Sequence, residues 1–308
     1  MNEQQWRKYV VAKTDVVEQK MCANKWDDID YSKLPSQASS MYRTAFYKHS
    51  EDKYTSYIEA LQRGDKGVKV NAGAIYPYQL INRSDDPISA EQWKSLPDYI
   101  GDSKESFLPV VDVSGSMVYG AVDKSGTTPM DVAISLGLYC AERNKSAFKD
   151  VVCTFHEKPT LHKLQQVRFH SRVSEIKRLP WGMSTDIDAV YRQILSHGVK
   201  FGVSPEDMPT KLLIISDMQF NAGVKKSDTL EGHRRAFEEA GYVFPQIVFW
   251  NVSDRSGSIP VTVGTNGTAL ISGFSPSNMK SLLCGDLNPV KVMEKAISDP
   301  RYDVTSYN

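Results

Sequence analysis

The chain has 308 residues, enough for one large domain or two ordinary ones. Its 37 basic residues balance 37 acidic residues, so no overall field favours nucleic acid or an anionic membrane. No segment approaches the roughly 20 apolar residues that span a bilayer, and the first 20 residues contain no apolar signal-peptide core. We therefore expect a cytoplasmic protein with no membrane partner.

The cysteines are widely scattered and form no C-x-x-C pair, which predicts neither a zinc knot nor a disulfide framework. A reducing compartment fits this usage. We expect four buried thiols, at Cys22, Cys140, Cys153 and Cys284.

The first 105 residues predict helices and no strand. Apolar residues recur at helical spacing, and acidic residues begin a segment that stops at Gly64. Four helical segments are expected: residues 6–21, a segment that carries Tyr42 and Phe46, residues 51–63, and a short helix that begins with a capping box of Ser89 and Gln92.

After Phe107 the pattern changes to alternating strands and helices. Runs that are apolar at nearly every position are typical of strands buried on both faces, so they predict a mainly parallel sheet between helices. The expected strands are residues 107–112, 150–155, 211–217 and 246–252, and the expected helices are residues 127–144, 184–199 and 233–241. The fold class is thus a doubly wound α/β domain over residues 106–308, preceded by a small helical region over residues 1–105.

The end of the chain predicts smaller elements. Residues 259–273 carry an Asn-Gly turn between short strand-like pieces, which indicates either a hairpin or a crossing to an edge strand. Two closing helices are expected at residues 276–285 and 289–298.

Polar residues follow the predicted strands. Asp112, Ser114 and Ser116 come just after the first strand in the stretch "FLPVVDVSGS", and Asp217 ends a later strand in "KLLIISD". Ser184 and Thr185 stand at the head of the helix between them. Ligands of doubly wound sheets bind beyond the carboxyl ends of the strands, which is where all these side chains are expected.

Each of these segments also has a plain structural interpretation. Aspartate and serine after a strand are ordinary turn residues, and a serine or threonine before a helix is commonly its N-cap. The convergence of three hydroxyl-rich or carboxylate-bearing segments on one edge nevertheless favours a metal site.

The same residues carry a resemblance to a known family. The D-x-S-x-S of Asp112, Ser114 and Ser116, with Thr185 and Asp217, resembles the metal-ion-dependent adhesion site of von Willebrand factor A domains. The resemblance covers roughly residues 105–308. A helical segment followed by an A domain also resembles the Ro/TROVE RNA-binding proteins, and more closely an uncharacterised A-domain family of large viruses and eukaryotes, which "KMCANKWDDIDYSKLPS" and "KVNAGAIYPYQLI" resemble.

The resemblance implies Mg²⁺ as cofactor, with Mn²⁺ or Ca²⁺ as alternatives. Ser114, Ser116 and Thr185 would touch the ion, while Asp112 and Asp217 would act directly or through water. Hydroxyl and carboxylate oxygens are the hard donors that magnesium prefers. A cation held chiefly by neutral hydroxyls keeps much of its charge and can accept an Asp or Glu from a protein partner. The expected function is metal-dependent protein binding, not catalysis.

Enzymatic motifs are incomplete. The phosphoaspartate D-x-D, the phosphate loop G-x-x-x-x-G-K-[ST] and the nucleophile elbow G-x-S-x-G are all absent around Asp112–Ser116. A metal-dependent hydrolase therefore remains the third hypothesis, without an evident base beyond the lone His156.

RNA binding is the main alternative, as a Ro-like ribonucleoprotein component. The helical region interleaves aromatic and basic residues, including Arg43 and Lys48, and such patterns can stack bases and hold phosphates. However, residues 1–105 contain 15 basic and 16 acidic residues. An amphipathic helical region with a solvated polar face explains the same pattern, and about one hundred residues cannot close a Ro-type ring of helical repeats.

Overall fold

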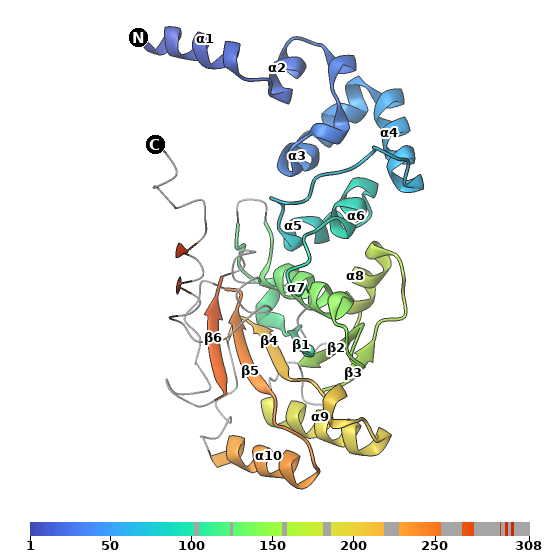
Figure 1. Ribbon diagram of the computed structural model, residues 1–308, viewed down its shortest axis with the longest axis vertical. Helices are drawn as coiled ribbons and strands as arrows, with labels where there is room; N and C mark the ends of the chain where they lie inside the picture. Colours follow the sequence, from blue (N-terminus) through green and yellow to red (C-terminus); the bar gives the residue numbers. More distant parts are fainter. Residues whose placement is uncertain are drawn as a thin grey trace. The chain divides into compact units, whose positions relative to one another are not determined.

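The computed structural model contains two compact units, one helical and one built on a sheet (Figure 1). The helical unit comprises Met1–Ile75 and Arg83–Pro97, and the sheet unit comprises Tyr76–Asn82 and Asp98–Asn308. The structure describes residues 1–101, 105–123, 126–155, 159–180, 186–218, 228–253 and 267–273, with 290, 293–294 and 297–298.

The described part of the helical unit contains helices and no strand, as expected. Its elements are α1 (Glu3–Lys13), α2 (Val17–Cys22), the short 3-10 helices η1 (Trp26–Asp28) and η2 (Tyr31–Lys33), α3 (Ser36–His49), α4 (Glu51–Arg63) and α6 (Pro87–Lys94). The predicted end of α4 is confirmed, because Gly64 adopts the left-handed conformation that glycine tolerates best.

Two expectations for this unit are wrong in detail. The predicted helix over residues 6–21 is broken, since Thr14 and Val16 are extended and β-branched residues favour that backbone. The N-cap of α6 is Asp86, not Ser89. The Asp86 carboxylate accepts hydrogen bonds from the backbone N–H groups of Ile88 and Ser89, and Pro87 occupies the first helical position.

The core of the helical unit is aromatic. Tyr31, Phe46 and Tyr54 are buried, and the Tyr31 ring centroid lies 5.2 Å from that of Phe46 and 4.9 Å from that of Tyr54. Aliphatic residues from the other helices complete this cluster, among them Ile29, Leu34, Ile58 and Leu61. Several of the aromatic residues that alternate with basic ones in the sequence are therefore core residues.

The sheet unit is built on six strands in the order β3-β2-β1-β4-β5-β6. Every neighbouring pair is parallel except β2 and β3. The strands are β1 (Phe107–Asp112), β2 (Val151–Phe155), β3 (Leu161–Lys163), β4 (Lys211–Ser216), β5 (Gln246–Asn251) and β6 (Thr268–Ser272). Strand β3 and helix α8 (Phe169–Lys177) were not predicted from the sequence, whereas the four long strands were.

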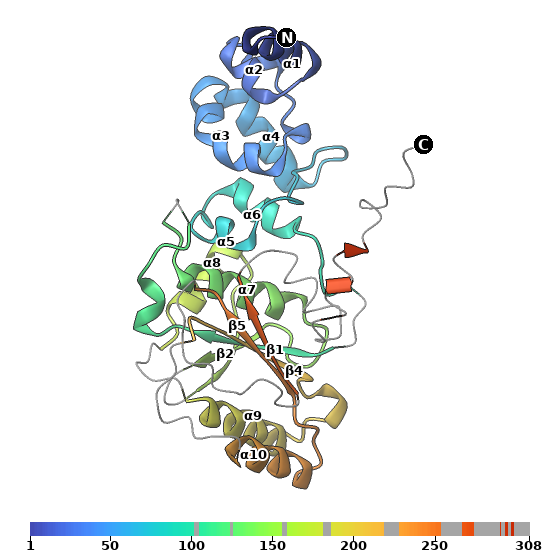
Figure 2. The same cartoon turned by 90° about the vertical axis from the view of Figure 1, so that its left-hand side faces the viewer.

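Helices cover both faces of the sheet (Figures 1 and 2). Helices α7 (Pro129–Arg143) and α8 lie on one face, and α9 (Ile187–Phe201) and α10 (Asp228–Glu239) lie on the other. The short α5 (Pro77–Ile81) packs against α7. All six residues of β1 and all six of β4 are buried, as expected for strands covered on both faces. The predicted fold class, a doubly wound mainly parallel α/β sheet after a helical region, is confirmed.

Helix α7 approaches the sheet closely at Gly137. A Cβ atom at this position would lie 2.4 Å from Cγ2 of Val111 in β1. Glycine therefore lets α7 pack directly on the strand that leads to Asp112.

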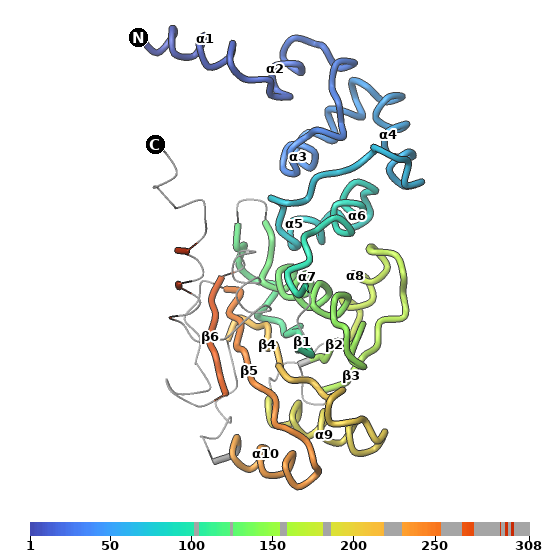
Figure 3. The backbone as a smooth tube through the Cα atoms, in the orientation of Figure 1, coloured from blue at the N-terminus to red at the C-terminus, as the bar shows by residue number. Residues whose placement is uncertain are grey.

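Strand β6 pairs in parallel with β5 at the edge of the sheet, which confirms the edge-strand alternative (Figure 3). Residues 259–266, which would form the other half of the hairpin, lie outside the described residues. The closing helix expected at residues 276–285 lies outside the described residues, as do five of the ten residues of the one expected at residues 289–298. No described helix has the length and apolar character needed to cross a membrane.

The cysteines agree only in part with expectation. Cys140 and Cys153 are buried free thiols, and burial raises the pKa of each to about 12. Cys22, the last residue of the short helix α2, is exposed. Cys284 lies outside the described residues.

Candidate metal centre

The connection order of the strands places a topological switch point, here called the crevice, between β1 and β4. From β1 the chain passes through α7 to β2 on one side, and it later returns through α9 to β4 on the other side. Connections that leave to opposite sides open a crevice at the carboxyl ends of the two strands, where doubly wound proteins bind ligands. Val111 pairs with Ile215 in the register of these strands, so Asp112 lies beside Ser216.

Asp112 is the last residue of β1, and its side chain is fully buried. Its Oδ1 accepts a hydrogen bond from the backbone N–H of Ser114 at 2.9 Å. Its Oδ2 accepts one from the Ser216 hydroxyl at 2.5 Å. These residues therefore do form the turn that the plain structural interpretation predicted. The turn holds the Asp112 carboxylate at the crevice.

Asp217 follows β4 directly and is also buried. Burial raises the pKa of Asp112, and the nearby Asp217 carboxylate raises it further, while the hydrogen bonds from Ser216 and Ser114 oppose both effects. No basic group contributes to this pKa among the described residues. Two buried carboxylates that repel each other form a site at which a bound cation would be stabilising.

Ser114 and Ser116 lie in the loop after β1, where Ser116 belongs to the short 3-10 helix η3 (Gly115–Val118). Their hydroxyl oxygens are 3.1 Å apart. Ser114 is buried and Ser116 is partly exposed, so the pair extends from the buried carboxylates toward solvent. Four of the five predicted ligands are therefore collected at one end of β1 and β4.

The fifth predicted ligand, Thr185, lies outside the described residues, as does Ser184. The described chain resumes at Asp186, which caps α9 by accepting a hydrogen bond from the backbone N–H of Ala189 at 2.9 Å. Helix α9 thus begins where the sequence predicted a helix.

Ser216 is a residue of this site that the sequence analysis missed. Its hydroxyl donates to Asp112 and accepts from the backbone N–H of Met218 at 3.0 Å. Met218 itself has a φ of 62°, a left-handed conformation that is costly for a residue other than glycine. The sequence did contain a signal, because Ser216 stands directly before Asp217 at the end of a predicted strand. The last residues of neighbouring parallel strands lie side by side, as Ser216 lies beside Asp112.

The predicted RNA contacts lie on α3 in the helical unit. Nε of Arg43 is 3.2 Å from a carboxylate oxygen of Asp86, and 17% and 15% of the two side chains are exposed. Lys48 is exposed. Arg43 therefore forms an ion pair within its own unit, whereas Lys48 is exposed to solvent, so the two basic residues differ in their surroundings.

The donor set fits a hard divalent cation. Within the described residues no group of three or more His, Cys, Asp or Glu side chains is placed to hold a metal. The set at the crevice instead combines two carboxylates with two serine hydroxyls. Oxygen donors of this kind suit Mg²⁺, Mn²⁺ or Ca²⁺ rather than zinc.

Comparison with known proteins gives relatives but no assigned activity. The chain is 34% identical to uncharacterized protein L728 of Acanthamoeba polyphaga mimivirus over 302 residues, which cover 90% of this chain and 51% of that protein. It thus spans about half the length of the curated relative it matches.

A solved structure, that of the Ro (RSR) protein of Deinococcus radiodurans, matches with a TM-score of 0.47 and 15% identity, over 76% of this chain and 48% of that chain. A similarity at this level extends to neither ligand nor function.

The family matches divide the chain in two. Residues 4–110 match DUF2828, a domain of unknown function, and this match covers the helical unit and strand β1 up to Val110. Residues 106–301 match a second domain of unknown function, DUF7788, which includes the whole crevice. Because this second match spans more than half of the 308 residues, the chain belongs to the DUF7788 family.

Proposed function

We propose that this protein is a divalent-cation-dependent protein-binding module whose cation is Mg²⁺, with Mn²⁺ or Ca²⁺ as substitutes. The observation that carries the proposal is the pair of buried carboxylates, Asp112 and Asp217, at the ends of neighbouring strands beside two serine hydroxyls. Asp112, Ser114, Ser116 and Asp217 would hold the ion, together with Thr185 from the sequence pattern.

The chemistry of these donors supports binding of an acidic partner. Neutral hydroxyls leave most of the cation's charge uncompensated, so an Asp or Glu carboxylate from a partner would be attracted as a further ligand. The exposed rim beside the hydroxyls includes Tyr119, of which 68% is exposed and which can contact such a partner. Buried charge and an exposed aromatic side chain are thus adjacent in the sequence.

We favour binding over catalysis. Both oxygens of Asp112 accept hydrogen bonds, from the Ser114 backbone and the Ser216 hydroxyl, so this carboxylate is held in place rather than available as a base toward water. The arrangement positions ligands for an ion and leaves the hydrolase hypothesis without an assigned base.

A thermal unfolding experiment tests the ion site. In chelator-stripped protein, Mg²⁺ or Mn²⁺ at 100 times its Kd should stabilise the native state by about 2.7 kcal/mol and raise Tm accordingly. Ser114→Ala should abolish this increase. Ser135→Ala is the matched control, because the Ser135 hydroxyl is also buried but donates within α7 to the carbonyl of Val132. If stripped wild-type protein shows no metal-dependent change in Tm, the site is disproved.

A capture experiment tests the partner. Full-length protein is used as bait with and without EDTA, and both proteins and RNA are identified in the bound fraction. The proposal predicts a protein partner that is lost with EDTA and with Ser116→Ala, and acetate at high concentration should compete weakly for the open position. Capture of RNA that is insensitive to EDTA and weakened by salt and by Lys48→Ala would instead assign the function to the helical unit.

A further inference from the structure

Helix α1 buries no face within its own unit. It has 11 residues, none of them buried, and 56% of Trp6 and 50% of Tyr9 are exposed. The two rings stack on the helix surface with centroids 6.0 Å apart. An isolated helix of fewer than roughly 12 residues is marginal in water, and exposed aromatic pairs mark contact surfaces.

Local interactions support α1 only at its ends. Asn2 and Gln5 form a capping box, and Glu3 pairs with Arg7 one turn later. At the other end, Nε2 of Gln19 donates to the carbonyl of Val11 at 3.2 Å. None of these contacts covers the face that carries Trp6 and Tyr9, so this face is left exposed on the helical unit.

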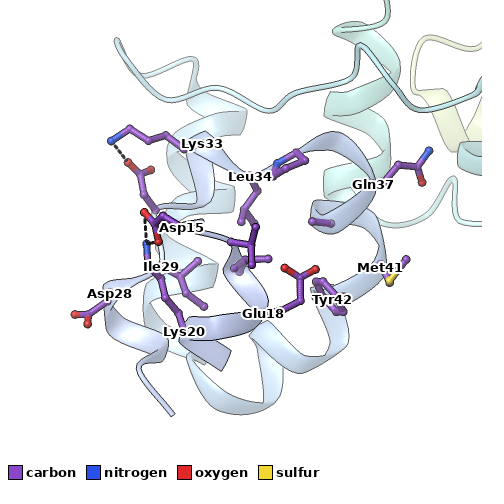
Figure 4. A pocket seen from close by; sticks show the side chains of 15 residues that line it. Asp15, Glu18, Lys20, Asp28, Ile29, Lys33, Leu34, Gln37, Met41 and Tyr42 are labelled. Carbon is purple, nitrogen blue, oxygen red and sulfur yellow. Dashed lines mark hydrogen bonds and ion pairs between the residues drawn. The ribbon is translucent and has the colours of Figure 1, made fainter. Parts of the chain in front are cut away.

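The same unit contains a pocket with an apolar floor, between α2 and the start of α3 (Figure 4). Its volume is about 640 Å³, which is sufficient for one or two aromatic side chains. Ile29 and Leu34 are buried in its lining, and Met41 at its edge is 65% exposed.

The rim of this pocket is acidic. Four carboxylates and two ammonium groups line it, and the two lysines are taken by ion pairs, Lys20 with Asp15 at 3.3 Å and Lys33 with Asp30 at 3.0 Å. Glu18 and Asp28 form no ion pair with a described residue. Glu18 instead accepts a hydrogen bond from Tyr42, which raises the pKa of that phenol.

Helix α1 has the complementary charge. Its acidic residue Glu3 is paired with Arg7, while Lys8 and Lys13 form no ion pair with a described residue. With about 3.6 residues per turn, Lys13 lies on the same face of α1 as Trp6 and Tyr9, whereas Lys8 lies on the opposite face. An apolar pocket with two uncompensated carboxylates thus matches a helix face with two exposed aromatic rings and one uncompensated ammonium group.

We propose that α1 of one copy docks in this pocket of a second copy, and that the exchange is reciprocal in a two-fold symmetric homodimer. Trp6 and Tyr9 cover Ile29 and Leu34, while Lys13 lies near Glu18 and Asp28. Docking within one chain is prevented by connectivity. A single extended residue, Thr14, separates the end of α1 from Asp15 in the pocket lining, so the helix cannot reverse its direction onto its own pocket.

Sedimentation velocity of the full-length chain tests the association. We expect a monomer–dimer equilibrium with a Kd on the order of 10 µM, because a helix of this length buries less than the roughly 1,000 Å² of a stable interface. The double variant Trp6→Ala and Tyr9→Ala should raise this Kd about tenfold or more. Phe201→Ala, which removes a 62% exposed ring on α9, is the control and should leave the Kd unchanged.

A charge-reversal exchange tests the pairing itself. Lys13→Glu reverses the charge on the docked face of the helix, and Glu18→Lys with Asp28→Lys reverses the pocket rim; each variant alone should be monomeric at the concentration where wild type is half dimeric. Mixed in equal amounts, the two variants should form a heterodimer, because one of its two interfaces then joins a reversed helix to a reversed rim and the other keeps the wild-type pairing.

The proposal would be overturned by a wild-type chain that stays monomeric at about 200 µM, or by a dimer that survives the loss of both aromatic rings. It would also be overturned if the two charge-reversed variants fail to associate in the mixture although circular dichroism shows that each of them is folded. The dimer should also be insensitive to EDTA, so its failure and a failure of the metal site are distinguishable.

Discussion

The aromatic core of the helical unit and the polar end of β1 and β4 bury opposite kinds of side chain. Around Phe46 the buried groups are rings, and the charged residues are exposed or paired at the surface, as Arg43 is with Asp86. At the crevice, Asp112 and Ser216 are completely buried. Burying rings is favourable by itself, whereas burying a carboxylate costs free energy unless something compensates it.

This difference separates stability from function. If the crevice holds the proposed ion, substitutions there should change ligand binding more than folding. Substitutions in the aromatic core should change folding alone.

Phe46→Ala should lower the free energy of unfolding by about 3–5 kcal/mol, because it removes a fully buried ring from the aromatic core. The neighbouring Tyr47→Ala is the matched control, since Tyr47 is 36% exposed and should cost far less. Urea denaturation of the two variants measures the difference. Equal losses would show that the core is not centred on Phe46.

Gly137→Ala should lower the free energy of unfolding by about 2 kcal/mol. The added methyl would meet Val111 at 2.4 Å, and this overpacking outweighs the roughly 1 kcal/mol of helix propensity that alanine gains. Gly232→Ala in α10 is the control, because a methyl group at that position would meet no described neighbour within 4 Å, and this variant should be slightly more stable than wild type. Thermal unfolding of both variants gives the comparison, and two stabilised variants would contradict the close packing of α7 on β1.

The sequence predicted the elements that hydrophobic periodicity determines. Strands β1, β2, β4 and β5 and helices α3, α4, α7 and α9 were recognised because their apolar pattern is continuous. Strand β3 has three partly exposed or exposed residues, and it exists only by pairing with β2. The break between α1 and α2 depends on the backbone of Thr14 and Val16, which periodicity does not report.

The sequence predicted those parts of the candidate site that depend only on where the strands end. Asp112 and Asp217 could be placed at one edge because parallel strands end together. Ser216 was missed although it stands directly before Asp217, because this position indicates a partner of Asp112 only once the β1–β4 register is known. The basic and aromatic residues of α3 were ambiguous for a similar reason, because the sequence does not show that Arg43 is paired with Asp86.

Arg43→Ala should lower the free energy of unfolding by about 1–2 kcal/mol, since it leaves the mostly buried Asp86 without its cation. Lys48→Ala should change it by less than about 0.5 kcal/mol, as expected of an exposed side chain. Chemical denaturation measures both, and binding to a labelled single-stranded RNA at two salt concentrations shows whether either residue contacts nucleic acid. A loss of RNA affinity in folded Arg43→Ala protein, without a loss of stability, would reverse the structural assignment of Arg43.

Asp112→Asn should make the metal-free protein more stable, which is the opposite of the effect expected for Phe46→Ala, Gly137→Ala and Arg43→Ala. Removing one of two neighbouring buried carboxylates relieves their repulsion, and the amide keeps an oxygen for the Ser114 backbone N–H and an NH₂ group that can donate to Ser216. We expect the free energy of unfolding without metal to rise by about 1 kcal/mol, while the stabilisation by Mg²⁺ disappears. Urea denaturation with EDTA and with saturating Mg²⁺ measures the two effects on the same variant. A variant that is less stable without metal yet still stabilised by Mg²⁺ would mean that Asp112 serves the turn after β1 and not an ion.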